Sequence, residues 1–310
     1  CSIFYKNEIK KRFRFCETID PIYFLKAKKN NVEINNMINS HKEDGVALTK
    51  FLYWLKSNVI KRNISELDAQ SKLEQFRKKN KNYIFSSFNT IAGTGPNGAI
   101  VHYRATKKSN RIIKKKDIFL CDSGGQYKYG TTDVTRTVCF TKPKKKIKDI
   151  FTMVLKGHIG VTTFNLNKNT TGNQIDKVAR APLKSKGKDY AHGTGHGVGH
   201  FLNVHEGPHS ISKFNKVKFS EGMIVSNEPG YYKKNKFGIR IENLVYVKKL
   251  NNKIFFENLT LAPIDKDLIN FDLLTKKEFN YLNDYNKKIY QSLNPYLKKK
   301  EKNWLKSFIN

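Results

Sequence analysis

The chain has 310 residues, of which 38% are hydrophobic and 12% aromatic, a composition that is typical of a globular protein and excludes an intrinsically disordered one. No apolar run approaches the roughly 20 residues that a membrane-spanning helix needs, so we expect no membrane partner. The first residues, 1–25, also lack the apolar core of a signal peptide.

The cysteines indicate a reducing compartment. Cys1, Cys16, Cys121 and Cys139 show neither CxxC spacing nor a paired framework, which is typical of reduced intracellular thiols. Together with the missing signal peptide, this predicts a cytoplasmic location. The chain begins with cysteine rather than methionine, and we expect it to be a fragment that lacks its N-terminal part.

The net charge of +33 raises the question of nucleic-acid binding. The lysines are spread along the whole chain, and no stretch interleaves basic residues with stacking aromatic residues as a nucleic-acid-binding module does. We therefore expect no specific nucleic-acid partner.

Hydrophobic spacing predicts helices and then strands in the first half of the chain. Apolar residues recur at helical spacing over 33–56, and His41 falls on the apolar face, where we expect it to pack in the core. The sequence SELD at 65–68 resembles a capping box that starts a second helix. Strands are predicted within the segments 82–93, 117–127 and 131–140, with a Gly-Pro-Asn-Gly turn after the first of them.

In the second half of the chain, predicted helices are again followed by predicted strands. Helices are predicted near 146–166 and 171–182, the latter capped by Thr170 or Thr171. Further strands are predicted at 223–232, 237–247 and 253–263. The tail from Thr275 has the apolar stripe of a packed helix, which Pro295 interrupts.

Four acidic residues stand where strand segments meet turns. Asp122 and Asp133 flank the glycine-containing sequence SGGQYKYGTT, which a hairpin can close so that both carboxylates meet. Glu228 precedes a Pro-Gly turn, and Glu242 lies in the next strand segment, so these two can also face each other.

The stretch DYAHGTGHGVGHFLNVHEGP at 189–208 adds histidines between glycines. Four carboxylates and one or two histidines suit a pair of divalent cations such as Mn²⁺, Co²⁺ or Zn²⁺. The four negative charges balance two such ions and leave a bridging hydroxide as the reactive anion. Without metal, the carboxylates would repel one another and their pKa values would rise.

Four segments, in order, resemble aminopeptidase P: CDSGGQYKYGTTDVTRTV, DYAHGTGHGVGHFLNVHEGP, SNEPGYY and GIRIENL. That enzyme removes the N-terminal residue from peptides whose second residue is proline. It belongs to the pita-bread metallopeptidases, with methionine aminopeptidase, prolidase and creatinase. The resemblance runs from about residue 20 to the C-terminus. It implies an α+β pita-bread fold with pseudo-twofold related halves, antiparallel sheets flanked by helices, and a C-terminal helical extension.

The resemblance also implies a division of the chain. Residues 1–30 would be the remnant of a preceding N-terminal domain and its linker, 31–262 the catalytic domain, and 263–310 the aminopeptidase P-type extension. The N-terminal domains of the family support dimer formation, so a homodimer is implied for the full-length protein. Lys184 and Arg104 depart from the family pattern, which often has tryptophan and proline there, but neither is a predicted ligand.

Site roles follow from the same resemblance. It implies five ligands for two metal ions, with Mn²⁺ expected and Zn²⁺ or Co²⁺ as alternatives. These ligands are Asp122, Asp133, His196, Glu228 and Glu242. Asp133 and Glu242 would bridge the two ions, and Glu228 would also accept and relay the proton.

The remaining histidines receive separate expectations. His205 would contact the scissile carbonyl or its oxyanion, and His102 would lie against the substrate near the proline site. His192 would help to shape that site, and Arg240 would hold a carboxylate or the substrate backbone. For His200 we expect a structural role only.

We therefore expect a manganese-dependent Xaa-Pro aminopeptidase, in which a hydroxide that bridges two metal ions attacks the carbonyl before proline. One alternative is a prolidase-type dipeptidase, against which the tail at 278–305 argues because it resembles the C-terminal region of aminopeptidase P. The other is a metal-free pita-bread domain that binds histones or RNA, which the positive charge would suit. All five ligand positions are filled, which argues against that alternative.

Overall fold

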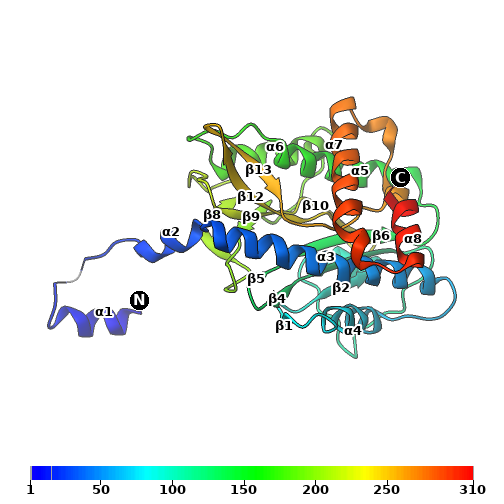
Figure 1. Ribbon diagram of the computed structural model, residues 1–310, viewed down its shortest axis with the longest axis horizontal. Helices are drawn as coiled ribbons and strands as arrows, with labels where there is room; N and C mark the ends of the chain where they lie inside the picture. Colours follow the sequence, from blue (N-terminus) through cyan, green and yellow to red (C-terminus); the bar gives the residue numbers. More distant parts are fainter. Residues whose placement is uncertain (1, 15, 310) are drawn as a thin grey trace.

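The computed structural model describes residues 2–14 and 16–309. Its first helices, α1 (Ile3–Lys10) and α2 (Pro21–Ala27), lead along an arm to the body of the protein, and α1 buries none of its residues (Figure 1). Cys1 lies outside the described residues, and Cys16, Cys121 and Cys139 are free thiols. Within the described ranges, no helix has the length and apolarity that a membrane crossing requires.

The four helices predicted before residue 190 are present, with small differences in their ends. α3 (Asn31–Val59) starts at a capping box of Asn30 and Glu33, and α4 (Glu66–Arg77) starts at the predicted capping box of Ser65 and Asp68. His41 is buried in α3, and its Nδ1 lies 2.7 Å from the Met37 carbonyl, which confirms the core prediction.

The next helix pair is α5 (Lys145–Thr162) and α6 (Gly172–Lys184), and Thr171 is the N-cap of α6. α5 ends before the predicted residue 166. A polar turn follows, in which the Asn167 side chain accepts the Asn169 N–H at 2.9 Å.

The strands form four sheets, and every pairing between strands is antiparallel. The strands are β1 (Tyr83–Ser86), β2 (Ile91–Thr94), β3 (Ile118–Ser123), β4 (Gly125–Tyr127), β5 (Gly130–Thr131), β6 (Val134–Cys139), β7 (Gly195–Gly197), β8 (Glu206–Ile211), β9 (Ile224–Asn227), β10 (Gly230–Lys233), β11 (Phe237–Arg240), β12 (Asn243–Leu250) and β13 (Lys253–Asn258). Their orders are β1-β4-β5, β2-β3-β6, β10-β11 and β13-β12-β9-β7-β8.

Several predicted strands are each two strands in the structure. The segments 117–127, 131–140, 223–232 and 237–247 were expected to be single strands, and each is divided between two sheets. Hydrophobic alternation cannot show such a division in β3–β4 and β5–β6, where every residue of both strands is buried. β10, by contrast, is only partly buried. Three of the four acidic residues lie at these divisions, and Asp122 lies one residue before the end of β3.

The five-stranded sheet is covered on both faces by helices. Val225, Val245 and Val247 pack with residues of α5 and α6. Their neighbours along the strands, Ile224 and Leu244, pack with residues of α3 on the other face. Because side chains alternate between the two faces of a strand, this sheet is buried on both sides and gives the site a rigid floor.

The two halves of the protein repeat one arrangement. In the first half β3 pairs with β6, and the chain between them forms the β4–β5 hairpin; in the second half β9 pairs with β12, and the chain between them forms β10–β11. Each half also supplies two helices in contact, α3 with α4 and α5 with α6. This is the α+β arrangement with pseudo-twofold halves that the resemblance implied.

The C-terminal extension is helical, as expected. α7 (Lys276–Leu293) starts at a Thr275 capping box, the short helix η4 (Asn294–Tyr296) contains Pro295, and α8 (Lys299–Ile309) follows. In Figure 1 α7 and α8 both lie beside α3. Apolar residues of α7 and α8 belong to the same core cluster as those of α3 and α5.

A buried ion pair ties α3 to α4 beneath the first sheet. Arg77 donates to both oxygens of Asp44 at 2.7 Å and 3.2 Å, and Tyr127 donates to Asp44 at 2.8 Å. Arg77 also donates to Ser123, the neighbour of Asp122, at 3.0 Å. This network therefore supports the strand end that carries a candidate site residue.

We expect Arg77→Met to lower the free energy of unfolding by about 3–5 kcal/mol, because it leaves the Asp44 charge buried without its partner. Urea unfolding measures the difference. Lys78→Met is the matched control: this lysine is 66% exposed, and its loss should change stability by no more than about 0.5 kcal/mol. Equal effects of the two substitutions would contradict the proposed importance of the pair.

Candidate active site

One cavity of about 330 Å³ collects every residue to which the sequence assigns a metal-binding, catalytic or substrate-binding role. It is lined by all nine candidates: His102, Asp122, Asp133, His192, His196, His205, Glu228, Arg240 and Glu242. A larger cavity of about 410 Å³ lies beside α3 and α4, but its lining contains lysines and no histidine. The chemistry-bearing residues thus converge at one place in the described chain.

Strand pairing brings the four carboxylates together. Asp122 stands opposite Thr135 on β6, and Asp133 immediately precedes that strand. In the second half, Asn227 stands opposite Asn243, so Glu228 and Glu242 occupy the next positions beyond this pair. Backbone hydrogen bonds therefore fix all four carboxylates before any ligand binds.

The two halves are held together directly at these positions. The Glu242 N–H donates to the Thr135 carbonyl at 3.1 Å, and the Thr135 hydroxyl donates to the Glu242 carboxylate at 2.6 Å. The buried Arg136 guanidinium donates to the Thr135 and Glu242 carbonyls at 2.7 Å and 2.6 Å. The bridge between the first and second carboxylate pairs is thus made by β6.

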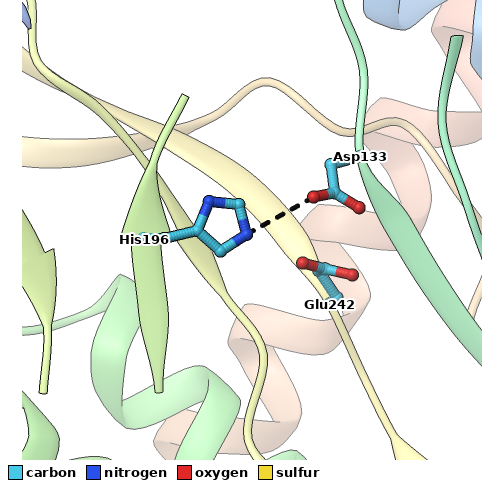
Figure 2. A group of neighbouring side chains, drawn as sticks. All are labelled: Asp133, His196 and Glu242. Carbon is cyan, nitrogen blue, oxygen red and sulfur yellow. Dashed lines mark ion pairs between the residues drawn. The ribbon is translucent and has the colours of Figure 1, made fainter. Parts of the chain in front are cut away.

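His196 enters from β7, where glycine permits close packing. A Cβ at Gly195 would lie 1.8 Å from the Ser226 carbonyl oxygen, so only glycine fits beside β9. The His196 Nδ1 lies 2.9 Å from the Gly197 carbonyl, which can only accept, so Nδ1 carries a proton and Nε2 is the nitrogen available to a metal ion. Figure 2 shows that Nε2 points toward Asp133, at 3.5 Å from its Oδ2.

Burial and, after it, electrostatic repulsion raise the pKa values of two carboxyl groups in the cavity. Burial and the charges of Asp122 and Glu228 raise the pKa of Asp133 well above its ordinary value. Burial and the neighbouring carboxylates, Asp133 first, do the same to the pKa of Glu242. This is the rise that was expected for the carboxylates without metal. The Arg240 guanidinium, which donates to Asp122 at 2.6 Å, is a single positive charge among four carboxylates.

These residues fit divalent cations. One ligand atom each of Asp133, His196 and Glu242 lie within 4.8 Å of one another, and Glu228 Oε1 lies 3.5 Å from His196 Nε2. Asp122 Oδ1 and Asp133 Oδ1 are buried without a hydrogen-bond partner in the described structure. Carboxylate oxygens with one imidazole nitrogen are a donor set for Mn²⁺, Co²⁺ or Zn²⁺.

A second group of possible metal ligands, Cys139, Asp265 and Asp267, already has a cation beside it. Lys56 already lies 2.8 Å from Asp265 and 3.3 Å from Asp267, so the charge there is balanced by the protein itself. Of these two groups, only the one with His196 combines uncompensated carboxylates with a free imidazole nitrogen.

The other histidines surround this cluster. The His205 ring stands nearly perpendicular to that of His196, with ring centres 4.2 Å apart. His102 follows the short helix η1 (Gly95–Ala99), which β11 approaches so closely that a Cβ at Gly238 would lie 1.7 Å from the Gly98 carbonyl oxygen. This contact brings the His102 loop to the cavity.

Two family models match the sequence. The model described as metallopeptidase family M24 matches residues 35–249, and the C-terminal region of peptidase M24 matches residues 253–308. The first match covers more than half of the chain.

The chain belongs to metallopeptidase family M24.

Named relatives agree with this membership. "Xaa-Pro aminopeptidase 1" of Dictyostelium discoideum is 44% identical over 94% of this chain and 49% of its own length. "Probable Xaa-Pro aminopeptidase P" of Phaeosphaeria nodorum is 43% identical over 94% of this chain and 47% of its own length. The chain spans about half the length of the curated relatives it matches.

Solved M24 structures confirm the predicted pita-bread fold. The X-prolyl aminopeptidase of Caenorhabditis elegans, described as a cytosolic enzyme with a di-nuclear active site, has a TM-score of 0.90 at 36% identity, covering 94% of this chain and 49% of that one. The Xaa-Pro dipeptidase of Bacillus anthracis has a TM-score of 0.74 at 27% identity, covering 86% and 71%.

Some residues of this M24 site were not singled out from the sequence. The Tyr232 hydroxyl links two candidates: it accepts from Arg240 Nη1 at 2.6 Å and lies 2.8 Å from His192 Nε2. Tyr232 and Arg240 are diagonal neighbours on one face of the β10–β11 hairpin, a relation that strict alternation along both strands could have indicated. Thr135 and Ser226, which donate to Glu242 and Glu228, carry no such signal.

In the metal-free protein, we expect Asp133→Asn to raise the free energy of unfolding, by more as the pH rises. The folded state raises the pKa of this carboxyl, so the folded protein binds the proton more tightly, and the contribution of Asp133 to stability falls above the unfolded pKa of about 4. The difference from the unsubstituted protein should grow by more than about 1 kcal/mol between about pH 5 and about pH 8.

Urea unfolding of chelator-treated protein measures this effect. Asp284→Asn is the control, because its side chain is 78% exposed and should show no such trend. A difference that stays constant with pH would show that Asp133 feels no strong repulsion. Adding Mn²⁺ should stabilise the unsubstituted protein more than the Asp133→Asn variant, since cation binding relieves the same repulsion.

Proposed function

We propose that this chain is the catalytic part of a metal-dependent Xaa-Pro aminopeptidase, which hydrolyses the bond between an N-terminal residue and a following proline. The observation that carries the proposal is the cavity that gathers four carboxylates around His196, whose Nε2 lies 3.5 Å from both Asp133 and Glu228. The names of the aminopeptidase relatives, each covering over nine-tenths of this chain, support the substrate class.

We propose two divalent ions, Mn²⁺ in the first place, held by Asp122, Asp133, His196, Glu228 and Glu242. When bound, such ions supply Lewis acidity and lower the pKa of water to near neutrality. Four carboxylates neutralise two such ions, so the charges of this donor set are matched to them. Arg240 then positions Asp122, since its Nη2, Nη1 and Nε donate to Asp122, Tyr232 and Thr135 respectively.

Glu228 is the group proposed to accept a proton from the attacking water. Its side chain is 17% exposed at the cavity, and Oε1 accepts the Ser226 hydroxyl at 3.2 Å, which orients the carboxylate. A carboxylate in this position can pass the proton on to the leaving nitrogen of proline.

His205 is proposed to donate a hydrogen bond to the carbonyl oxygen as negative charge develops there. Burial and the neighbouring His196 lower the pKa of His205, so its ring is neutral at pH 7 and has one N–H to donate. The ring faces the cavity, and in the described structure it has no competing hydrogen-bond partner. Such a donor acts mainly in the transition state.

His102 and His192 are proposed to shape the site around the proline. His102 is exposed at the mouth of the cavity. His192 is held by the Tyr232 hydroxyl at its Nε2 and by the Gly193 carbonyl, 2.7 Å from its Nδ1. His192 therefore forms a fixed wall, and His102 is the side chain with room to meet a substrate.

We also propose a cytosolic location and, for the full-length protein, a homodimer. The free thiols and the likeness to the Caenorhabditis elegans protein, which is described as a cytosolic enzyme, support the location. The dimer rests on the resemblance alone, and sedimentation of the full-length protein would test it.

The second candidate function is that of a dipeptidase, because M24 prolidases and dipeptidases have the same fold. The C-terminal region match at 253–308 and the lower identity of these structures favour the aminopeptidase.

We expect the Mn²⁺-loaded protein to release free arginine from Arg-Pro-Pro, to leave Arg-Ala-Pro intact, and to lose activity after chelation. Liquid chromatography of the products measures this, with Zn²⁺ and Co²⁺ tested alongside. Hydrolysis of the dipeptide Arg-Pro alone would establish the dipeptidase instead. No hydrolysis of any peptide with any of the three metals would count against an enzyme.

We expect His205→Ala to reduce kcat by about 10²–10³ with a smaller change in KM, because one oxyanion donor is lost. Metal content and the melting temperature should stay near those of the unsubstituted protein, since His205 makes no hydrogen bond in the described structure. A near-normal kcat would refute the role, and loss of metal would make His205 a ligand.

A further inference from the structure

The catalytic role proposed for His205 raises the question of what holds this side chain in place. His205 is exposed at the cavity, and its ring contacts only His196 among the described rings. Within the described ranges it has no hydrogen-bond partner. Its position must therefore come from the backbone on either side.

That backbone belongs to the loop between β7 and β8, which has few internal contacts. The Gly199 N–H donates to the Asn203 carbonyl at 3.0 Å, and Phe201 and Leu202 at its tip are 40% and 51% exposed. Gln126 of β4 donates to the Leu202 carbonyl at 2.8 Å. On the far side of His205, the next residue is the first of β8.

That next residue, Glu206, is anchored by a buried charge pair. Its side chain is fully buried, and its two oxygens lie 2.6 Å from Lys29 Nζ and 3.2 Å from Lys26 Nζ. The Lys29 side chain is 1% exposed. A charge-assisted contact of this length between two buried groups is strong and directional.

Lys29 is itself fixed to the body of the protein. Its N–H donates to the Gly222 carbonyl at 3.0 Å, and its neighbour Lys28 forms a backbone bridge with Met223, just before β9. A Cβ at Gly222, whose φ is +81°, would lie 2.2 Å from the Lys29 carbonyl oxygen, so this approach is tight. The ammonium group therefore marks a fixed point relative to the sheet.

The same segment meets the loop a second time. Glu33, in the first turn of α3, lies 3.8 Å from His200 Nδ1 and also completes the capping box with Asn30. Lys29, between α2 and α3, and Glu33, at the start of α3, thus contact residues on either side of the loop's exposed tip. His200 is thus held by a contact with α3, whereas the His205 side chain projects into the cavity.

We propose that Lys29 is a positioning residue for catalysis: its ion pair with Glu206 sets the position of the adjacent His205. The inference rests on the proposed function of His205. It also extends the catalytic unit toward the N-terminus, because Lys29 precedes the region matched by the M24 model, which starts at residue 35.

The test compares Lys29→Met with the matched control Lys28→Met, whose side chain is exposed. We expect Lys29→Met to lower kcat on Arg-Pro-Pro by about 10- to 100-fold with little change in KM, since a shift of about 1 Å in a catalytic group can cost about 10² in rate. Lys28→Met should behave like the unsubstituted protein.

A readout independent of activity is the imidazole NMR signal of His205 in the metal-free protein, assigned by its loss in His205→Gln. It should shift in Lys29→Met and stay unchanged in Lys28→Met. An unchanged signal in Lys29→Met would overturn the proposal, whether or not the protein hydrolyses peptides. If the unsubstituted protein shows no hydrolysis, the proposed function fails while this arm still tests the positioning.

The double variant Lys29→Met with Glu206→Met separates positioning from stability. Replacing both members of a buried ion pair by apolar residues usually restores stability, so its melting temperature should recover relative to Lys29→Met. We expect kcat to stay low and the His205 signal to stay shifted, because an apolar contact is less directional. Recovery of kcat together with the melting temperature would show that the pair only stabilises the fold.

Discussion

Mutual repulsion of four clustered carboxylates, three of them buried, is the constraint around which this fold is organised. Asp122, Asp133, Glu228 and Glu242 all lie at or next to strand ends whose pairing is fixed by backbone hydrogen bonds, so they cannot turn away to water together. The raised pKa values of Asp133 and Glu242 express the resulting strain in the metal-free protein. Cations that bind there relieve it, so the same arrangement that opposes folding without metal supplies affinity for metal.

Two buried arginines, Arg136 and Arg240, stabilise this arrangement in different ways. Arg136 donates to backbone carbonyls of both halves and to Asn243, so it joins strands without neutralising the cluster. Arg240 instead donates directly to Asp122, and through Tyr232 it reaches His192. One guanidinium thus secures the geometry while the other balances part of the charge. A site with more internal cations would fold more easily and bind divalent ions less well.

The sequence predicts this site better than it predicts the strands that form it. Turn residues such as Pro229 and Gly230 marked the places where Glu228 and its partner could meet, and the resemblance supplied the pairing across the two halves. The division of long apolar segments into two strands was missed, most clearly for β3–β4 and β5–β6, because burial on both faces removes the alternation that marks a strand end. The contact of Thr135 with Glu242 and the pairing of Lys29 with Glu206 join residues distant in the chain, and a single sequence carries no signal for them. The contact of Tyr232 with Arg240 is local, and alternation along the two strands could have indicated it.

The structure also separates two kinds of functional side chain. The carboxylates and His196 sit at or beside strands, where backbone hydrogen bonds fix them. His102 and His205 project from loops, where few bonds do. Metal binding requires several donors to keep one geometry, which strands provide, whereas a group that meets the substrate must approach without blocking entry. A loop in that role needs anchors near the reacting residue. Among the described contacts of the β7–β8 loop, the fully buried Glu206 is the anchor directly next to a histidine of the cavity. The precision of the site therefore depends on the segment before α3 as well as on the sheets.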